Sequence, residues 1–160
     1  MKSFILILLL VVSCTVFPQE NNSKESKETR VKFDPERNPA EDLKDAIKKS
    51  KALNKRILLD VGGEWCVWCH RLDKFFEDNP DINNFLKENF VVVKINYSPE
   101  NKNEEFLSKY PKAAGYPHLF VLSKKGKLLH SQNTGDLEKD KGYDSDKVMA
   151  FLQKWAIGKK

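Results

Sequence analysis

The sequence predicts a single α/β domain with a central mixed sheet of four to five strands and helices on both faces. Two nearly continuous apolar runs, 56–61 and 90–95, are separated by segments of helical spacing, which is typical of parallel strands joined by a crossover. Two later apolar runs, 118–122 and 127–130, enclose a glycine-containing turn and predict an antiparallel hairpin. Parallel and antiparallel pairs together make the sheet mixed. A chain of 160 residues has room for one such core.

The composition is that of an ordinary soluble domain and excludes some partners. The net charge of +5 comes from 28 basic and 23 acidic residues that are spread without a dense basic block. Nucleic acid is therefore not expected as a partner, because nucleic-acid binding proteins concentrate Lys and Arg on one face or along one segment. The sequence contains no motif for a nucleotide, a flavin or a metal, so we expect no cofactor.

The first residues have the features of an export signal. A short basic start precedes an apolar run over residues 4–12, which is too short for a permanent membrane helix and predicts a signal peptide over residues 1–18. The segment 11–14 resembles the lipobox of bacterial lipoproteins, in which cleavage after Ser13 leaves Cys14 as the lipidated first residue. Ordinary signal-peptidase cleavage a few residues later is the alternative. Either way we expect an exported protein that is periplasmic or anchored to the membrane on its extracytoplasmic side.

The segment after the signal is predicted to be a flexible tether. Residues 19–37 are mostly polar and charged, and such segments bury too little apolar surface to offset the entropy of ordering. Val31 and Phe33 are its apolar exceptions, and we expect at most light packing from them. The folded domain is then predicted over residues 38–160.

A helix and a buried strand open the domain. Asn38 can cap a helix whose first position is Pro39, and apolar residues at helical spacing continue it to Leu53. The strand at 56–61 is apolar on both faces and therefore central, and Gly62-Gly63-Glu64 turns the chain into the next helix.

Helices alternate with strands through the rest of the chain. The helix that begins near Cys66 ends at Asn79-Pro80, and a shorter helix precedes the strand at 90–95. A short helix is predicted over 104–110. After the hairpin, a glycine-containing loop over residues 131–143 leads to the final helix, whose apolar face is formed by Val148, Phe151, Leu152 and Trp155.

Two cysteines, Cys66 and Cys69, stand three residues apart at the start of the second predicted helix. One helical turn brings two Cα atoms within the range of roughly 4.4–6.8 Å that a disulfide requires. The helix N-terminus also points N–H groups and its positive end toward the first sulfur, which favours the thiolate. The thiolate is the form that attacks disulfides, so the pattern predicts a redox centre.

Three features in the same order resemble the thioredoxin superfamily over about residues 38–155. They are the motif Trp65-Cys66-x-x-Cys69, the acid Asp60 six residues before Cys66, and Gly115-Tyr116-Pro117 just before the hairpin. The resemblance implies a thioredoxin fold. Between the cysteines stand Val67-Trp68 in place of the Gly-Pro of thioredoxin itself, which is more like exported proteins of the thiol:disulfide interchange type. This dipeptide tunes the reduction potential in the family, so the direction of electron flow is left open.

Cys66 is expected to be the nucleophile, because it lies nearer the helix N-terminus and is more exposed, and Cys69 to resolve the mixed disulfide. Asp60 lies in an apolar strand, so burial should raise its pKa, and the resemblance implies that it exchanges a proton with Cys69 through water.

Other residues around the motif are expected to form the substrate site. Pro117 is the candidate for a cis peptide bond, and the resemblance implies that Tyr116 offers backbone hydrogen bonds to a substrate strand. Trp65 should pack beside the site. Trp68 is either an exposed apolar platform for a partner or a core residue.

The expected partners are disulfide-containing client proteins and a membrane-bound electron donor or acceptor, with the chain acting as a monomer. A reductase is favoured, and a disulfide oxidase or isomerase is the alternative direction. A different class of function stays open: a binding, chaperone or metal-handling module whose cysteines form a static disulfide. A zinc site at Cys66, Cys69, His70 and His118 is disfavoured, because a second well-spaced pair of ligands is missing.

Overall fold

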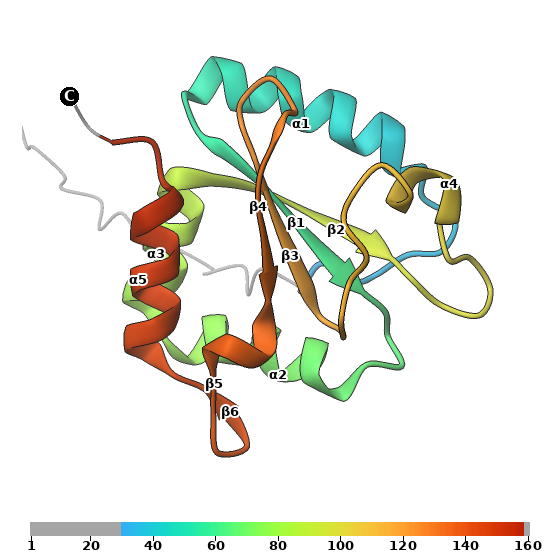
Figure 1. Cartoon of the computed structure of the whole chain (residues 1–160). Helices are drawn as coiled ribbons and strands as arrows, with labels where there is room; N and C mark the ends of the chain where they lie inside the picture. The colour runs from blue at the N-terminus through green and yellow to red at the C-terminus, as the bar shows by residue number, and fades with distance from the viewer. Residues whose placement is uncertain (1–29, 159–160) are drawn as a thin grey trace, which may run out of the picture.

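A computed structural model of the chain describes residues 30–158. The predicted signal peptide with Cys14 and the tether residues 19–29 lie outside the described residues. The centre of the molecule is a four-stranded sheet in the order β2-β1-β3-β4 (Figure 1). Its strands are β1 (Arg56–Gly62), β2 (Phe90–Asn96), β3 (His118–Leu122) and β4 (Leu128–Asn133). β1 and β2 pair parallel, whereas β3 pairs antiparallel with both β1 and β4, which confirms the predicted mixed sheet.

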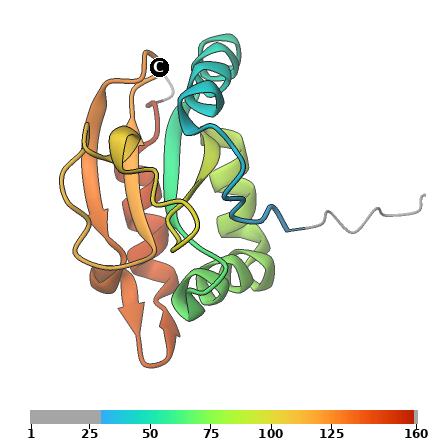
Figure 2. The same ribbon diagram turned by 90° about the vertical axis from the view of Figure 1, so that its right-hand side faces the viewer.

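Helices cover both faces of this sheet (Figures 1 and 2). One face packs against α1 (Pro39–Leu53) and α4 (Glu104–Leu107) through the strand residues Ile57, Leu59 and Phe120. The other face packs against α2 (Val67–Asp78), α3 (Pro80–Asn89) and α5 (Ser145–Trp155). Successive residues of a strand point to opposite faces, so Leu58 and Asp60 share the face of α2, α3 and α5.

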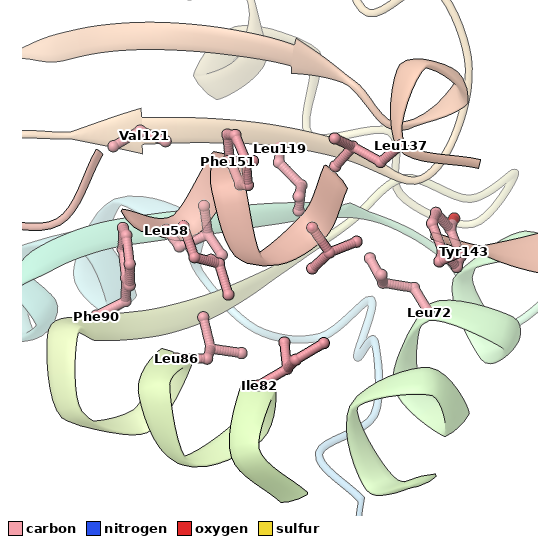
Figure 3. Packing of buried hydrophobic residues seen from close by; sticks show 12 residues of the cluster. Leu58, Leu72, Ile82, Leu86, Phe90, Leu119, Val121, Leu137, Tyr143 and Phe151 are labelled. Carbon is pink, nitrogen blue, oxygen red and sulfur yellow. The ribbon is translucent and has the colours of Figure 1, made fainter. Parts of the chain in front are cut away.

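The larger of the two main buried clusters fixes α2, α3 and α5 to the sheet (Figure 3). Each large aliphatic or aromatic side chain buried there stabilises the fold by about 1.5–3 kcal/mol. The labelled members come from all three helices, from the strands and from the segment before α5: Leu58, Leu72, Ile82, Leu86, Phe90, Leu119, Val121, Leu137, Tyr143 and Phe151.

Local signals placed the start of α1 correctly. The side chain of Asn38 accepts hydrogen bonds from the N–H groups of Ala40 and Glu41 at 3.0 and 3.3 Å, so the predicted cap is confirmed. The helix before β2 is shorter than α2, as predicted, with ten residues against twelve. Three segments differ from the prediction: α4 ends at Leu107 instead of residue 110, β4 continues to Asn133 instead of ending at residue 130, and the loop at 131–143 contains a 3-10 turn (Thr134–Leu137) and a small hairpin of β5 (Glu138–Lys139) and β6 (Gly142–Tyr143).

The predicted domain boundary at Asn38 comes too late. Phe33 is only 2% exposed and packs with Cys66 and Cys69 in one buried cluster, whereas Val31 is exposed. Figure 2 shows the blue segment before α1 running along the side of the molecule next to the green helices. The last residues of the predicted tether, 30–37, therefore belong to the domain.

Within residues 30–158, no helix combines the length and the apolar character that crossing a bilayer requires.

Candidate active site

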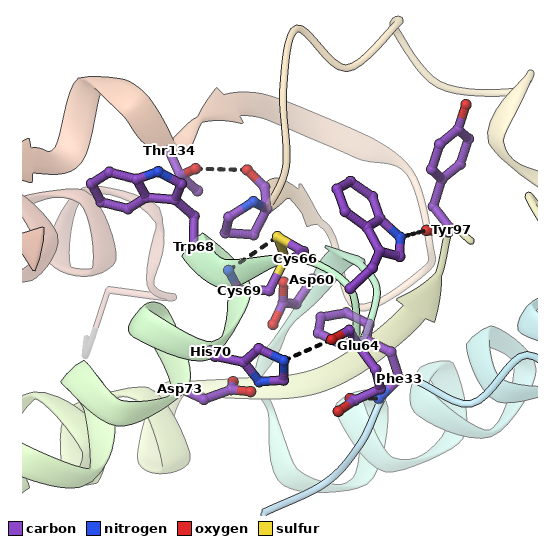
Figure 4. Close-up of a disulfide and its surroundings, with 12 residues drawn as sticks. Phe33, Asp60, Glu64, Cys66, Trp68, Cys69, His70, Asp73, Tyr97 and Thr134 are labelled. Atoms are coloured by element: carbon purple, nitrogen blue, oxygen red, sulfur yellow. Dashed lines mark hydrogen bonds between the residues drawn. A yellow bond between two sulfur atoms is a disulfide. The ribbon is translucent and has the colours of Figure 1, made fainter. Parts of the chain in front are cut away.

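Cys66 and Cys69 form a disulfide at the N-terminus of α2, with an S–S distance of 2.12 Å and a Cα–Cα distance of 5.2 Å (Figure 4). Cys66 is the N-cap residue of α2, and its Sγ accepts a hydrogen bond from the Cys69 N–H at 3.1 Å. The same N–H and the positive end of the helix stabilise a Cys66 thiolate when the pair is reduced. The spacing argument from the sequence is thus confirmed in its geometry.

Both cysteines are more buried than expected. Cys66 is 3% exposed and Cys69 is 1% exposed, so the predicted difference in exposure is small. Phe33 shares their buried cluster, and the side chains of Trp68 and Tyr116 pack against it. Very little of either cysteine is therefore open to solvent.

Gly62, the last residue of β1, makes room for the second sulfur. A Cβ atom at this position would overlap the Sγ of Cys69 and would lie 3.1 Å from the ring of Phe33. Any larger residue would push the cysteine, the phenylalanine or the strand out of place. The sequence reading treated this glycine only as part of a turn.

Asp60 lies on β1 on the same side as the cysteines, and Figure 4 draws it beneath the pair. It is 5% exposed, and one carboxylate oxygen accepts a hydrogen bond from Lys94 Nζ at 2.8 Å. Its other oxygen, Oδ1, is buried without a hydrogen-bond partner in the described part of the chain. Burial raises the pKa of Asp60 although the positive charge of Lys94 opposes this, which agrees with the predicted direction.

Lys94 connects Asp60 to a charge network that the sequence reading missed. Its Nζ also binds Asp73 on α2 at 2.7 Å. Burial alone would lower the pKa of Lys94, but the two carboxylates outweigh it and raise that pKa. Arg30 in turn binds Asp73 at 2.8 Å and pairs with Glu64. Glu64, the last residue of the predicted turn, thus forms an ion pair with Arg30.

The loop before β3 faces the cysteines. The Tyr116-Pro117 peptide bond is cis, as predicted, and the carbonyl of Pro117 accepts a hydrogen bond from Thr134 Oγ1 at 2.6 Å. The Tyr116 ring stacks on Tyr97 at 4.6 Å, and burial together with this neighbour raises the pKa of Tyr116 to about 12. The Tyr116 phenol is therefore neutral at any physiological pH.

The two tryptophans of the motif have different environments. Trp65 is 54% exposed, donates its Nε1–H to the Tyr97 carbonyl at 2.7 Å and meets Tyr116 edge-on at 5.9 Å. Trp68 is half-buried against Tyr143 at 5.9 Å. Trp68 packs against both buried clusters on this side and remains partly exposed, so its contact with a partner stays a prediction. The exposed apolar surface next to Cys66 consists of Trp65 together with Val67.

The two histidines considered as zinc ligands make other contacts. His70 Nε2 lies 2.8 Å from the backbone oxygen of Glu64, and His118 Nε2 lies 2.8 Å from Ser131 Oγ. Among residues 30–158, no three or more His, Cys, Asp or Glu side chains are grouped so that they could hold a metal ion.

The site and the fold match a known family over most of the domain. Residues 38–124 match the sequence model of a family described as Thioredoxin-like. The chain belongs to this thioredoxin-like family. The match covers Asp60, the cysteine pair and Tyr116-Pro117, and it stops before β4 and α5.

Two relatives are similar to parts of this chain. A thiol:disulfide interchange protein DsbD from Pseudomonas fluorescens is 29% identical over 121 residues, which cover 74% of this chain and 19% of that protein. Spermatogenesis-associated protein 20 from Rattus norvegicus is 41% identical over 51 residues, which cover 32% of this chain and 6% of that protein. The chain thus corresponds to about a fifth or less of the length of these relatives.

Solved structures share the thioredoxin fold. A disulphide isomerase from Xylella fastidiosa Temecula1 superposes with a TM-score of 0.67 at 25% identity, covering 78% of this chain and 96% of that one. The C-terminal domain of DsbD from Neisseria meningitidis in its oxidised form gives a TM-score of 0.55 at 18% identity, covering 78% and 99%. The second likeness concerns the fold alone.

Proposed function

We propose that this protein is an exported thiol-disulfide oxidoreductase that exchanges disulfides with client proteins and works mainly as a reductase. The observation that carries the proposal is the Cys66–Cys69 disulfide at the start of α2, above a buried Asp60 with one unpartnered oxygen. The relatives named for thiol:disulfide interchange and for disulfide isomerisation support the same chemistry.

In the reductive direction, the Cys66 thiolate attacks one sulfur of a client disulfide. A mixed disulfide forms, and the other client sulfur leaves as a thiolate. Cys69 then gives its proton through water to Asp60 and attacks Cys66 Sγ, which closes the Cys66–Cys69 disulfide and releases the second client sulfur. Two electrons pass from the dithiol to the client. A membrane-bound electron donor would restore the dithiol.

The surroundings of Cys66 favour this direction. A strong oxidant of this fold is oxidising because its reduced form is stabilised, and a cation beside the thiolate is one means of doing so. Here the residues between the cysteines are Val67 and Trp68, which carry no charge. His70 turns its ring to the backbone of Glu64, and Lys94 is held by Asp60 and Asp73. The Cys66 thiolate therefore relies on the helix N-terminus and the Cys69 N–H.

The client side of the proposal rests on the exposed rim of the site. Trp65 and Val67 provide apolar surface beside Cys66, and the backbone of Tyr116 is proposed to pair with an extended client segment. Pro117 would shape the groove between them. These are the roles that the resemblance implies for Tyr116 and Pro117, whereas the apolar surface is provided by Trp65 and Val67 and not by Trp68, for which the sequence suggested it.

Reduction of insulin disulfides tests the activity. The wild-type chain with dithiothreitol as electron source should precipitate the insulin B chain, whereas Cys66→Ser should not rise above the rate of dithiothreitol alone. Equal rates for the variant and the wild type would remove Cys66 from the nucleophile role. No activity in either protein would favour the binding or chaperone module instead.

A Cys69→Ala variant identifies the partners. Without the resolving thiol, the mixed disulfide with Cys66 accumulates, so clients and the electron donor should be captured as covalent complexes that reductant releases. Capture that persists in a Cys66→Ser, Cys69→Ala double variant would not come from this chemistry.

The proposed location is extracytoplasmic, with the chain held to the membrane by lipid on Cys14. This part rests on the signal-like sequence before residue 19. Expression in a bacterial host with a labelled fatty acid should label the wild type, and Cys14→Ser should be exported without label. Label retained in Cys14→Ser would contradict the lipidation site.

A further inference from the structure

The segment just before α1 contributes to the active site although it lies outside the family match, which begins at residue 38. The backbone N–H of Phe33 donates to Glu64 Oε1 at 2.8 Å, and its side chain is buried with the two cysteines. The Phe33 ring also covers the ammonium group of Lys94, whose Nζ lies 4.2 Å from the ring centroid. Phe33 therefore touches both the disulfide and the cation that holds Asp60.

The charged groups next to Phe33 form one alternating chain. Glu64 pairs with Arg30, Arg30 with Asp73, Asp73 with Lys94, and Lys94 with Asp60. Three carboxylates share two cations, so this group of five side chains has a net charge of −1 when all of them are ionised. Asp60 stands at its most buried end and has the unpartnered oxygen. A proton taken up by the network is therefore best placed on Asp60.

The same segment borders a route for water. A hollow of about 230 Å³ reaches Asp60, Asp73 and Lys94 on the side of α2 and α3, and Arg30 and Val31 form part of its wall. A client bound over Cys66 would leave this hollow uncovered. Protons can then pass between Asp60 and solvent without crossing the client interface.

We propose that Arg30 and Phe33 are positioning residues that set the proton affinity of Asp60 during the resolving step, which rests on the disulfide exchange proposed above. Arg30 engages Asp73, so that Lys94 keeps its second hydrogen bond for Asp60. Phe33, which does not line the hollow, covers Lys94 on the side of the two cysteines. The N-terminal segment thus helps to position the groups of the active site, in addition to connecting the domain to the proposed export signal.

The groups that face Asp60 come from several elements. Lys94 approaches from β2, Asp73 from α2, and Arg30 from the N-terminal segment. Tyr143 from β6 is electrically coupled to Asp60, but burial raises the pKa of this phenol well above its usual range, so it stays neutral. The positive charges that act on Asp60 are therefore those of Lys94 and the Arg30 guanidinium, and substitutions can change how these two cations pair with the carboxylates.

The two residues act on the Asp60 pKa with opposite signs. In Arg30→Gln the Asp73 carboxylate loses its arginine and draws Lys94 away from Asp60, so the pKa of Asp60 should rise. In Phe33→Ala water reaches the ion pair from the side of the cysteines as well, and the desolvation of Asp60 lessens, so its pKa should fall. If Arg30 and Phe33 only stabilised the fold, the two substitutions would not shift the pKa of Asp60 in opposite directions.

Carbon-13 NMR titration of the Asp side-chain carboxyls in the oxidised full-length chain measures this directly, with Asp60→Asn assigning the signal. We expect the Asp60 midpoint to move up by about 0.5–1 pH unit in Arg30→Gln and down by a similar amount in Phe33→Ala. If Phe33→Ala fails to fold, Phe33→Leu takes its place. Leucine keeps an apolar side chain, so the shift of the Asp60 midpoint should have the same sign and be smaller.

A matched control lies in the same segment. Arg37 pairs with Asp42 at the start of α1, so Arg37→Gln should leave the Asp60 midpoint unchanged. The inference is overturned if the Asp60 midpoint is unchanged in Arg30→Gln and Phe33→Ala, or if it moves in the same direction in both. An equal shift in Arg37→Gln would also overturn it. The titration uses no client and no thiol chemistry, so it can fail while insulin reduction succeeds, and the reverse.

Discussion

Asp60 and Lys94 show at the scale of single residues what makes this site reactive. Asp60 is the one charged residue in 57–61 and Lys94 the one in 90–95, and the parallel register of β1 and β2 places them side by side. Burial costs each charge its hydration, and their mutual contact offsets part of that cost. The rest of the desolvation cost falls on the Asp60 carboxylate, because Lys94 donates hydrogen bonds to both Asp60 and Asp73.

Asp60 was predictable from the sequence, but its partner was not identified. An acid in an apolar strand is visible in one segment, and the raised pKa follows from burial. Lys94 would have been found by asking which residue of the second strand lies opposite Asp60, since Lys94 is the one charged residue in 90–95. The register needed for that step depends on the tertiary pairing of the two strands.

Asp60→Asn should change how stability depends on pH. Because burial raises the pKa of Asp60 above its unfolded value of about 3.9, the folded state keeps this proton to a higher pH than the unfolded state. The wild type therefore loses stability as the pH rises from about 4 through the folded pKa. The variant lacks this loss, so its free energy of unfolding relative to the wild type should increase across that window.

Urea unfolding at a series of pH values measures the effect. Asp45→Asn is the matched control, because Asp45 is an exposed carboxylate whose pKa is lowered by its hydrogen bond with Lys48. The relative stability of this control should fall, or stay flat, as the pH rises. A falling trend for Asp60→Asn would contradict a raised pKa of Asp60.

At the scale of elements, the parts decided by local chemistry were predicted and the parts decided by packing were not. The cap of α1, the buried strands and the start of α2 follow from neighbouring residues in the sequence. The small hairpin of β5 and β6 does not. Its formation depends on burial of Tyr143 and on the hydrogen bond from the Asp144 N–H to the Leu137 carbonyl at 2.9 Å, which close the loop onto α2.

Removing the cap of α1 should weaken the fold but leave the chemistry intact. Asn38→Ala deprives two backbone N–H groups of their acceptor and should lower the free energy of unfolding by about 1 kcal/mol. Asn38→Asp retains an acceptor and should cost much less. The insulin-reduction rate should equal that of the wild type in both variants, because α1 lies on the sheet face opposite Asp60. A loss of activity at equal folding would show that α1 positions the site.

At the scale of the whole molecule, the contact between the N-terminal segment and α2 could not be predicted. Arg30 and Phe33 precede Glu64 by 34 and 31 residues, and the segment around Arg30 is polar enough to indicate a tether. Only the finished fold places Glu64 and Asp73 where Arg30 reaches both. The domain therefore starts earlier than composition suggests.

The reduction potential of the Cys66–Cys69 pair tests the direction proposed for the whole protein. With no cation between the cysteines, the reduced form is not specially stabilised, and we expect a value near the roughly −270 mV of a thioredoxin rather than the roughly −120 mV of a strong oxidant. Equilibration in dithiothreitol redox buffers, followed through the fluorescence of the adjacent tryptophans, gives this value. A potential close to −120 mV would reverse the proposed direction.

Val67→His tests the cause of that potential. Val67 is 61% exposed, so the substitution disturbs little packing, and an imidazolium beside Cys66 should stabilise the thiolate. A tenfold stabilisation of the reduced pair corresponds to a rise of about 30 mV, which is the increase we expect at pH 6. Val67→Gln is the uncharged control and should stay within a few millivolts of the wild type, and the histidine effect should fade as the pH rises above about 7.5, where the imidazole is neutral. An equal rise in both variants would assign the change to lost apolar surface and not to charge.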